Sequence, residues 1–219
     1  MLAYLSWHRP AAGVEQATYE QALERFHRSL AHRPPSGFRS SAAFRVAEIP
    51  WLVSIAAEDR DSDRPSQPVP ETGAPPAQPG YEDWYLLDDW GAVGVLEEAA
   101  VSRGHLTAHD RLAALAGTAT GSVYRLIEGC ARLDGAGVAV WVSRAPGHEH
   151  PSLSALLGDG MEPDLGGLWR RCLGLGPAPE FCLLAAEAPS GVASSRLPAG
   201  WSAIASARDV LWSGLGAGS

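Results

Sequence analysis

The stretch from Leu2 to His8, LAYLSWH, alternates between two kinds of side chain and predicts a β-strand at the start of the chain. One face of this strand carries Ala3, Leu5 and Trp7, and the other carries Tyr4, Ser6 and His8. On such a strand the apolar face is expected to pack in a core, and the polar face can carry functional residues. Which residues share a face on each remaining strand therefore bears on both the fold and the function.

Working outward from this strand, the apolar spacing changes between period 2 and period 3.6 and predicts the order β-α-β-β-α-β. Tyr19, Ala22, Leu23, Phe26 and Leu30 form the buried stripe expected of the first helix, which Pro34 and Pro35 end. The elements expected after the first strand are a helix over Gly13–Ala31, a strand over Phe38–Val46, a strand over Glu82–Leu87, helical pieces over Trp90–Val101 and Thr107–Ala116, and a strand over Ser122–Glu128.

The second half of the chain is less regular. It predicts strands over Val138–Ser143 and Phe181–Ala186, an interrupted helix over Leu153–Leu173, and one or two strands within Ser202–Trp212. A weak internal echo links the halves, since YLSWHRPAAG near the start is similar to VWVSRAPGHE later on: each is a strand that ends in Arg and Pro.

Two such units in one chain resemble the dimeric α/β-barrel superfamily in its fused form, which includes EthD-like proteins, antibiotic-biosynthesis monooxygenases, muconolactone isomerases, polyketide cyclases and chlorite dismutases. The resemblance rests on element order over residues 1–128. It implies an α+β fold of two ferredoxin-like halves, residues 1–128 and a shorter 138–219, joined by a linker over 129–137. The Pro-rich and Ser-rich segment 58–80 is expected to be a mobile insertion, either a lid or a passive loop.

Composition excludes several classes of function. The net charge is −8 and all 17 basic residues are scattered arginines, which argues against a nucleic-acid partner. The absence of lysine excludes Schiff-base chemistry and a phosphate-loop lysine. Three cysteines without paired spacing predict no disulfide framework, and no apolar run is long enough to cross a membrane. We therefore expect a cytoplasmic protein.

The polar face of the first strand supplies the candidate active site. If helices cover the apolar face, Tyr4, Ser6 and His8 point into the barrel, and the same reasoning sends Phe38, Phe44 and Val46 to the helices. Because the first and third strands are neighbours in a ferredoxin-like sheet, His8 is expected to meet Asp83 or Tyr85. These three are the predicted catalytic residues, and the predicted substrate-binding residues are Tyr4, Ser6, Arg9, Arg39, Arg45 and Trp141.

In this hypothesis His8 is the general acid or base, Asp83 or Tyr85 orients it, and Arg9, Arg39 or Arg45 binds an oxyanion. The alternative is a strand-end histidine that only bonds a backbone carbonyl. His27 is interpreted as a core or boundary residue at the edge of its helix stripe. His105 and His109 have the i, i+4 spacing of metal ligands, but the glutamate of the H-E-x-x-H motif is absent, so no metal site is predicted.

Three functions stay open. The first is an enzyme that acts on an aromatic or polyketide-like small molecule by acid/base chemistry without a cofactor, in oxygenation, isomerisation or cyclisation. The second, implied by the resemblance to chlorite dismutases, is a haem protein with His8, His27 or His105 as ligand. The third is a non-catalytic binding or structural module with a barrel filled by side chains. A homodimer is also left open.

Overall fold

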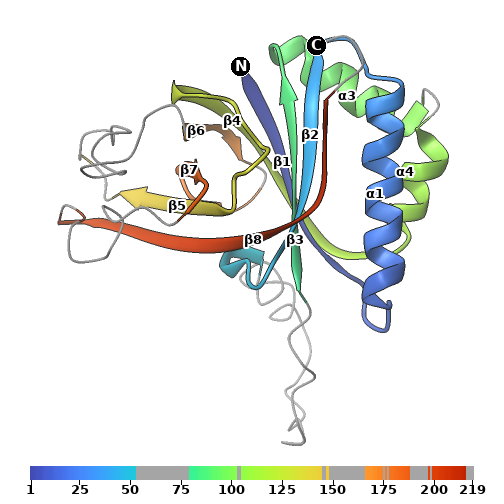
Figure 1. Ribbon diagram of the computed structural model, residues 1–219, viewed down its shortest axis with the longest axis horizontal. Helices are drawn as coiled ribbons and strands as arrows, with labels where there is room; N and C mark the ends of the chain where they lie inside the picture. The colour runs from blue at the N-terminus through green and yellow to red at the C-terminus, as the bar shows by residue number, and fades with distance from the viewer. Residues whose placement is uncertain are drawn as a thin grey trace, which may run out of the picture.

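Eight antiparallel strands close into one barrel, shown in Figure 1. The computed structural model describes residues 1–52, 79–102, 105–144, 147, 166–174, 176, 178–187, 197 and 199–215. The strands are β1 (Leu2–Pro10), β2 (Phe38–Val46), β3 (Gly80–Leu87), β4 (Ala116–Gly129), β5 (Val138–Arg144), β6 (Gly167–Gly174), β7 (Phe181–Ala185) and β8 (Trp201–Leu215). Around the barrel they follow the order β1-β3-β2-β8-β5-β7-β6-β4.

The prediction of an α+β fold built from two ferredoxin-like halves is wrong. The described residues form a single closed antiparallel β-barrel, and those that follow β4 contain no helix. Part of the helix expected over Leu153–Leu173 is instead strand β6, and the rest of that range, up to residue 165, lies outside the described residues. Nearly all of the expected insertion 58–80 lies outside them as well.

Two long strands explain why the sheet closes. The first part of β8 pairs with β5 and its second part with β2, so this strand passes from one side of the barrel to the other (Figure 1). In the same way β4 pairs with β1 and then with β6. These pairings satisfy the backbone groups that open sheet edges would leave unpaired. As a result the order β4-β1-β3-β2 of the first four strands is repeated as β8-β5-β7-β6 by the last four.

The barrel interior is packed with aromatic side chains. Trp7, Trp84, Trp141 and Trp169 are buried there, and the rings of Trp7 and Trp141 meet edge to face with centroids 5.4 Å apart. Trp141 therefore packs within the core and was wrongly expected to line a ligand cavity. Residues of seven strands contribute to this cluster, so the cluster lies inside the barrel.

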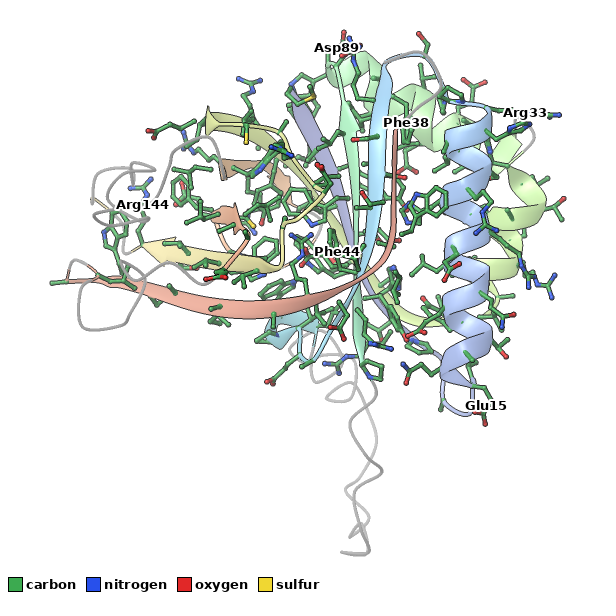
Figure 2. The ribbon with its side chains drawn as sticks, in the orientation of Figure 1. Glu15, Arg33, Phe38, Phe44, Asp89 and Arg144 are labelled. Carbon is green, nitrogen blue, oxygen red and sulfur yellow. The ribbon has the colours of Figure 1, made fainter. Side chains whose placement is uncertain are left out.

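The orientation predicted for the first two strands is also wrong. Ala3, Leu5 and Trp7 belong to the barrel interior, as do Phe44 and Val46 of β2. Phe38 does pack on the helix side, because the pairing register of β2 shifts between Phe38 and Ser40. Phe38 and Phe44, labelled in Figure 2, lie near opposite ends of β2. A closed barrel needs bulky apolar filling, and the most apolar face of each strand supplies it.

One ion pair is buried in this interior. Arg208 of β8 places its Nη2 atom 3.1 Å from Oε1 of Glu82 on β3, and both side chains are almost completely buried. The Trp7 indole donates a hydrogen bond of 3.2 Å to Oε2 of Glu82, and the Arg208 guanidinium lies 3.4 Å from the centre of the Phe44 ring. Burial lowers the pKa of Arg208, while the carboxylate of Glu82 opposes that shift. The pair links β3, one of the first four strands, to β8, one of the last four.

Three helices of the described residues cover the outer face of the first four strands: α1 (Gln16–His32), α3 (Trp90–Ser102) and α4 (Leu106–Ala113) (Figure 1). The buried face of α1 contains the five residues predicted for its stripe, which confirms that helix. None of the described helices has the length and apolar character needed to span a membrane. Between these helices and the sheet lies a second core, separate from the barrel interior.

Candidate functional site

A cavity of about 320 Å³ lies between the outer face of β1, β3 and β4 and the helices α1, α3 and α4. Its floor comes from the polar face of β1, namely Tyr4, Ser6 and His8, together with Asp83 and Tyr85 of β3. The prediction that this face points into the barrel is therefore wrong. The same polar residues do lie together, but they lie under the helices.

His8 and Asp83 form the centre of the site. Their strands pair so that Ser6 is opposite Asp83 and His8 is opposite Tyr81, and residues on the same face come together diagonally. Nε2 of His8 lies 2.9 Å from Oδ2 of Asp83, and the Tyr85 hydroxyl donates to the same oxygen at 3.2 Å. The predicted contact of His8 with Asp83 is present, and the alternative of a backbone partner alone does not describe this histidine.

Asp83 is an ionised carboxylate inside the protein. Burial by itself opposes its ionisation, but His8 and His27, through their charge when protonated and through their hydrogen bonds, outweigh that effect and hold the pKa of Asp83 well below its usual range. The other carboxylate oxygen, Oδ1, lies 3.4 Å from Nε2 of His27. One buried carboxylate is therefore shared by two imidazole rings.

The second ring nitrogen of His8 contacts a tyrosine. The Tyr19 hydroxyl, from α1, lies 2.7 Å from Nδ1 of His8. Burial, reinforced by the charge of Asp83, raises the pKa of Tyr19, so its phenol keeps its proton. Since ionised Asp83 can only accept, a neutral His8 carries its proton on Nε2 and accepts from Tyr19 at Nδ1. The three side chains form a directed chain, Tyr19 to His8 to Asp83.

His27 supports this chain from the helix side. It is fully buried, as its place on the helix stripe predicted, and its Nδ1 atom lies 2.8 Å from the hydroxyl of Ser41 on β2. Its ring stacks on Tyr85 at 5.1 Å with the planes 4° apart. The sequence interpretation of His27 as a core residue missed this link to Asp83.

The cavity wall is aromatic. Tyr4 stacks on Tyr85 with centroids 6.0 Å apart, and Phe26 meets Tyr85 edge to face at 6.4 Å. His109 of α4 lines the same cavity and packs edge to face on Phe26 at 5.8 Å. Such walls suit a flat organic ligand.

A second polar position lies away from His8. Glu97 of α3 lines the cavity, where burial and the carboxylate of Glu97 raise the pKa of Tyr4 to about 12. Because of this raised pKa, Tyr4 stays protonated. The backbone leaves room for this tyrosine at Gly121, where a Cβ atom would stand 3.0 Å from the Tyr4 hydroxyl.

Four of the predicted binding residues lie elsewhere. Arg39 pairs with Asp88 on the surface at 2.6 Å, and Arg45 pairs with Glu20 and Asp209, each at 3.1 Å. Trp141 is inside the barrel, and Arg9 is not among the residues that line the cavity. The alternation of β2 placed two arginines on the polar face, but acidic residues of α1, β8 and the turn after β3 pair with them outside the cavity.

Sequence reasoning missed three polar residues that line the cavity: Tyr19, Glu97 and His109. Tyr19 was assigned to the packing stripe of its helix, although a buried tyrosine hydroxyl requires a hydrogen-bond partner, and that requirement was the available signal. Glu97 and His109 carried no comparable signal, because helix packing alone decides which surface residues meet the sheet.

The spacing of His105 and His109 does not produce a metal site. His105 points to α1, with Nδ1 3.0 Å from the Ser29 hydroxyl and Nε2 3.1 Å from the Arg33 carbonyl. Within the described part of the chain, no group of three or more His, Cys, Asp or Glu side chains is arranged to hold a metal ion. Each ring nitrogen of the three suggested haem ligands, His8, His27 and His105, already faces a protein partner within 3.4 Å.

Comparison with known proteins supports the fold alone. No protein-family model matches the chain, and no curated protein sequence matches it. Among solved structures, the chain is similar to one described as "Crystal structure study of anthrone oxidase-like protein", with a TM-score of 0.51 and 9% sequence identity. The similarity covers 98% of this chain and 93% of that one, so the two proteins share the barrel as a whole.

Proposed function

We propose that this protein binds a flat aromatic molecule with a phenolic or enolisable group in the cavity beneath the helices and transfers a proton to or from it. The observation that carries the proposal is the hydrogen-bonded chain from Tyr19 through His8 to Asp83, whose members all line that cavity. An aromatic wall beside a proton relay is suited to such a ligand.

The proposed step begins with neutral His8. A substrate O–H or C–H group gives its proton to the Tyr19 oxygen while the Tyr19 proton passes to Nδ1 of His8. The substrate is left as a phenolate or enolate, and the new imidazolium is paired with the Asp83 carboxylate. The reverse transfer returns the proton. Because the pKa of Tyr19 is raised, the tyrosine passes the proton on and does not hold the negative charge.

The substrate class takes support from the similar structure, whose description is anthrone oxidase-like. An anthrone is an enolisable aromatic ketone, which matches the chemistry of the site. Oxygenation of its enolate requires dioxygen as co-reactant: one oxygen atom becomes the new carbonyl, and the other leaves as water with the two hydrogens of the methylene carbon. Isomerisation and cyclisation begin with the same proton transfer, so the first step defines the proposal.

The other two functions receive less support. A haem ligand needs a ring nitrogen that faces open space, and the three suggested histidines direct theirs to protein groups. The barrel interior is filled by side chains, as the structural-module alternative requires, but the cavity lies outside the barrel.

The direct test measures enolisation apart from oxidation. The purified protein is incubated without oxygen in D₂O with a hydroxylated anthrone, and exchange at the methylene carbon is followed by NMR. In air, oxygen uptake and quinone absorbance are followed instead. Wild-type protein should accelerate exchange, and His8→Gln should lower the rate about 100-fold or more, the range expected for loss of a general base.

His32→Gln is the matched control, because His32 is exposed at the end of α1 and does not line the cavity. Thermal melting establishes that both variants are folded. If wild-type protein exchanges the anthrone no faster than buffer, or if His8→Gln is as active as wild type, the proposed function is wrong.

A further inference from the structure

The permanent charges on the described residues that line the cavity are negative. The described lining residues include two carboxylates, Asp83 and Glu97, and neither Arg nor Lys. The remaining titratable groups among them are His8, His109 and three tyrosines. Arg39 and Arg45, which lie on the neighbouring strand, are held by acidic partners outside. A ligand that enters the cavity therefore meets negative charge without a permanent counter-charge.

The two carboxylates differ in burial and in their contacts. Asp83 is buried, and two imidazole rings and the Tyr85 hydroxyl already contact it. Glu97 is exposed on α3, lines the cavity and interacts directly with the Tyr4 hydroxyl. Its carboxylate has lone pairs left to accept a further hydrogen bond, since a carboxylate offers about four acceptor positions. Glu97 is thus the acidic group that a bound ligand can reach.

We infer that Glu97 is a specificity-determining residue that selects uncharged ligands bearing a hydroxyl donor and rejects ligands bearing a carboxylate or phosphate. This inference rests on the proposed function, because it assigns the ligand class of the same cavity. A ligand hydroxyl can donate to Glu97 at the end of the ring system remote from His8. An anionic ligand loses hydration on entry and is repelled, with no arginine among the described lining residues to compensate.

The selectivity is tested with two probes of one ring skeleton, 2-naphthol and 2-naphthoate, which are uncharged and anionic at pH 7. Their dissociation constants are measured by isothermal titration calorimetry. We expect wild-type protein to bind 2-naphthol about tenfold more tightly, the size of one unit-charge repulsion across a partly solvated cavity. Glu97→Gln should remove most of this preference by improving the binding of 2-naphthoate.

Glu98→Gln is the matched control, since Glu98 is the next residue of α3, is exposed, and does not line the cavity. It removes the same charge from the protein and should leave the ratio of the two constants within about twofold of wild type, as expected for a screened surface charge. Ala113→Trp, at an exposed lining position, places a bulky side chain at the cavity and should weaken 2-naphthol binding, which locates the probe.

The outcomes separate the two proposals. Equal binding of the probes, tighter binding of 2-naphthoate, or an equal effect of Glu97→Gln and Glu98→Gln overturns the role of Glu97 and leaves the proton relay standing. Failure of both probes to bind, or binding that Ala113→Trp does not weaken, also overturns the role of Glu97, and the proton relay is then judged separately by anthrone exchange in wild type and His8→Gln.

Discussion

The Tyr19 hydroxyl lies 2.7 Å from Nδ1 of His8, the nitrogen that faces away from Asp83. One histidine thereby connects a helix residue to a strand carboxylate, and both of its ring nitrogens are used. In the proposed mechanism this arrangement makes Tyr19, and not His8 alone, the group through which a substrate proton enters the relay. It also ties helix α1 to the sheet at the floor of the cavity.

Tyr19→Phe should lower the rate of anthrone exchange about 100-fold while changing ligand affinity only a few-fold, because the phenyl ring keeps the packing and removes the relayed proton. The rate is measured by NMR and the affinity by calorimetry. Tyr124→Phe is the control: Tyr124 is buried in the barrel, where its hydroxyl donates to the Pro179 carbonyl. An active Tyr19→Phe protein would show that the substrate proton reaches His8 directly.

Asp83→Asn should change how stability depends on pH. The folded-state pKa of Asp83 lies below its unfolded value of about 3.9, so the carboxylate stabilises the fold above that pH and loses this contribution as the pH falls. The free energies of unfolding of wild type and variant, measured with urea from pH 7 to pH 2.5, should differ most above about pH 5 and draw closer as the pH falls toward 2.5. A constant difference would mean that Asp83 does not titrate with a lowered pKa.

Arg208→Met should destabilise the protein by about 3–5 kcal/mol, because it leaves Glu82 buried without its counter-charge. Glu82→Gln combined with Arg208→Met should cost less than the sum of the two single substitutions, since neither ion then remains unpaired. Arg39→Met, which breaks the exposed pair with Asp88, is the comparison and should cost far less than Arg208→Met, because solvent screens an exposed pair. Urea unfolding measures all four, and strict additivity would show that the buried groups act independently.

Gly37→Ala should be more harmful than Gly13→Ala. Both glycines have positive φ, 78° and 83°, so alanine is strained at either site by about 1–2 kcal/mol. At Gly37 an added Cβ would also stand 2.6 Å from Cβ of Ala92 on α3, whereas nothing lies within 4 Å of the corresponding position at Gly13. Thermal unfolding should rank the variants in that order, and equal losses would show that α3 shifts to make room.

Much of the first half of the molecule was predictable because its signals are local. Two-residue alternation identified β1 and β3, and helical spacing identified the buried stripe of α1. The pairing of β1 with β3 then brought His8 to Asp83. In the second half, local patterns also identified strands β5, β7 and β8, but they failed at β6, which occupies part of a range that reads as a helix.

The sequence by itself determined which residues share a face over Leu2–His8, because side chains alternate along a strand without a bulge: Tyr4, Ser6 and His8 lie together on one face of β1, as the pattern requires. In β2 the register shift between Phe38 and Ser40 broke this alternation. Only the tertiary structure decided what that face meets. Closure of the sheet created an interior that the most apolar faces had to fill, which left the polar face of β1 beneath the helices. That face met Tyr19 and Glu97 there because helix packing, a long-range property, selects which helical side chains reach the sheet.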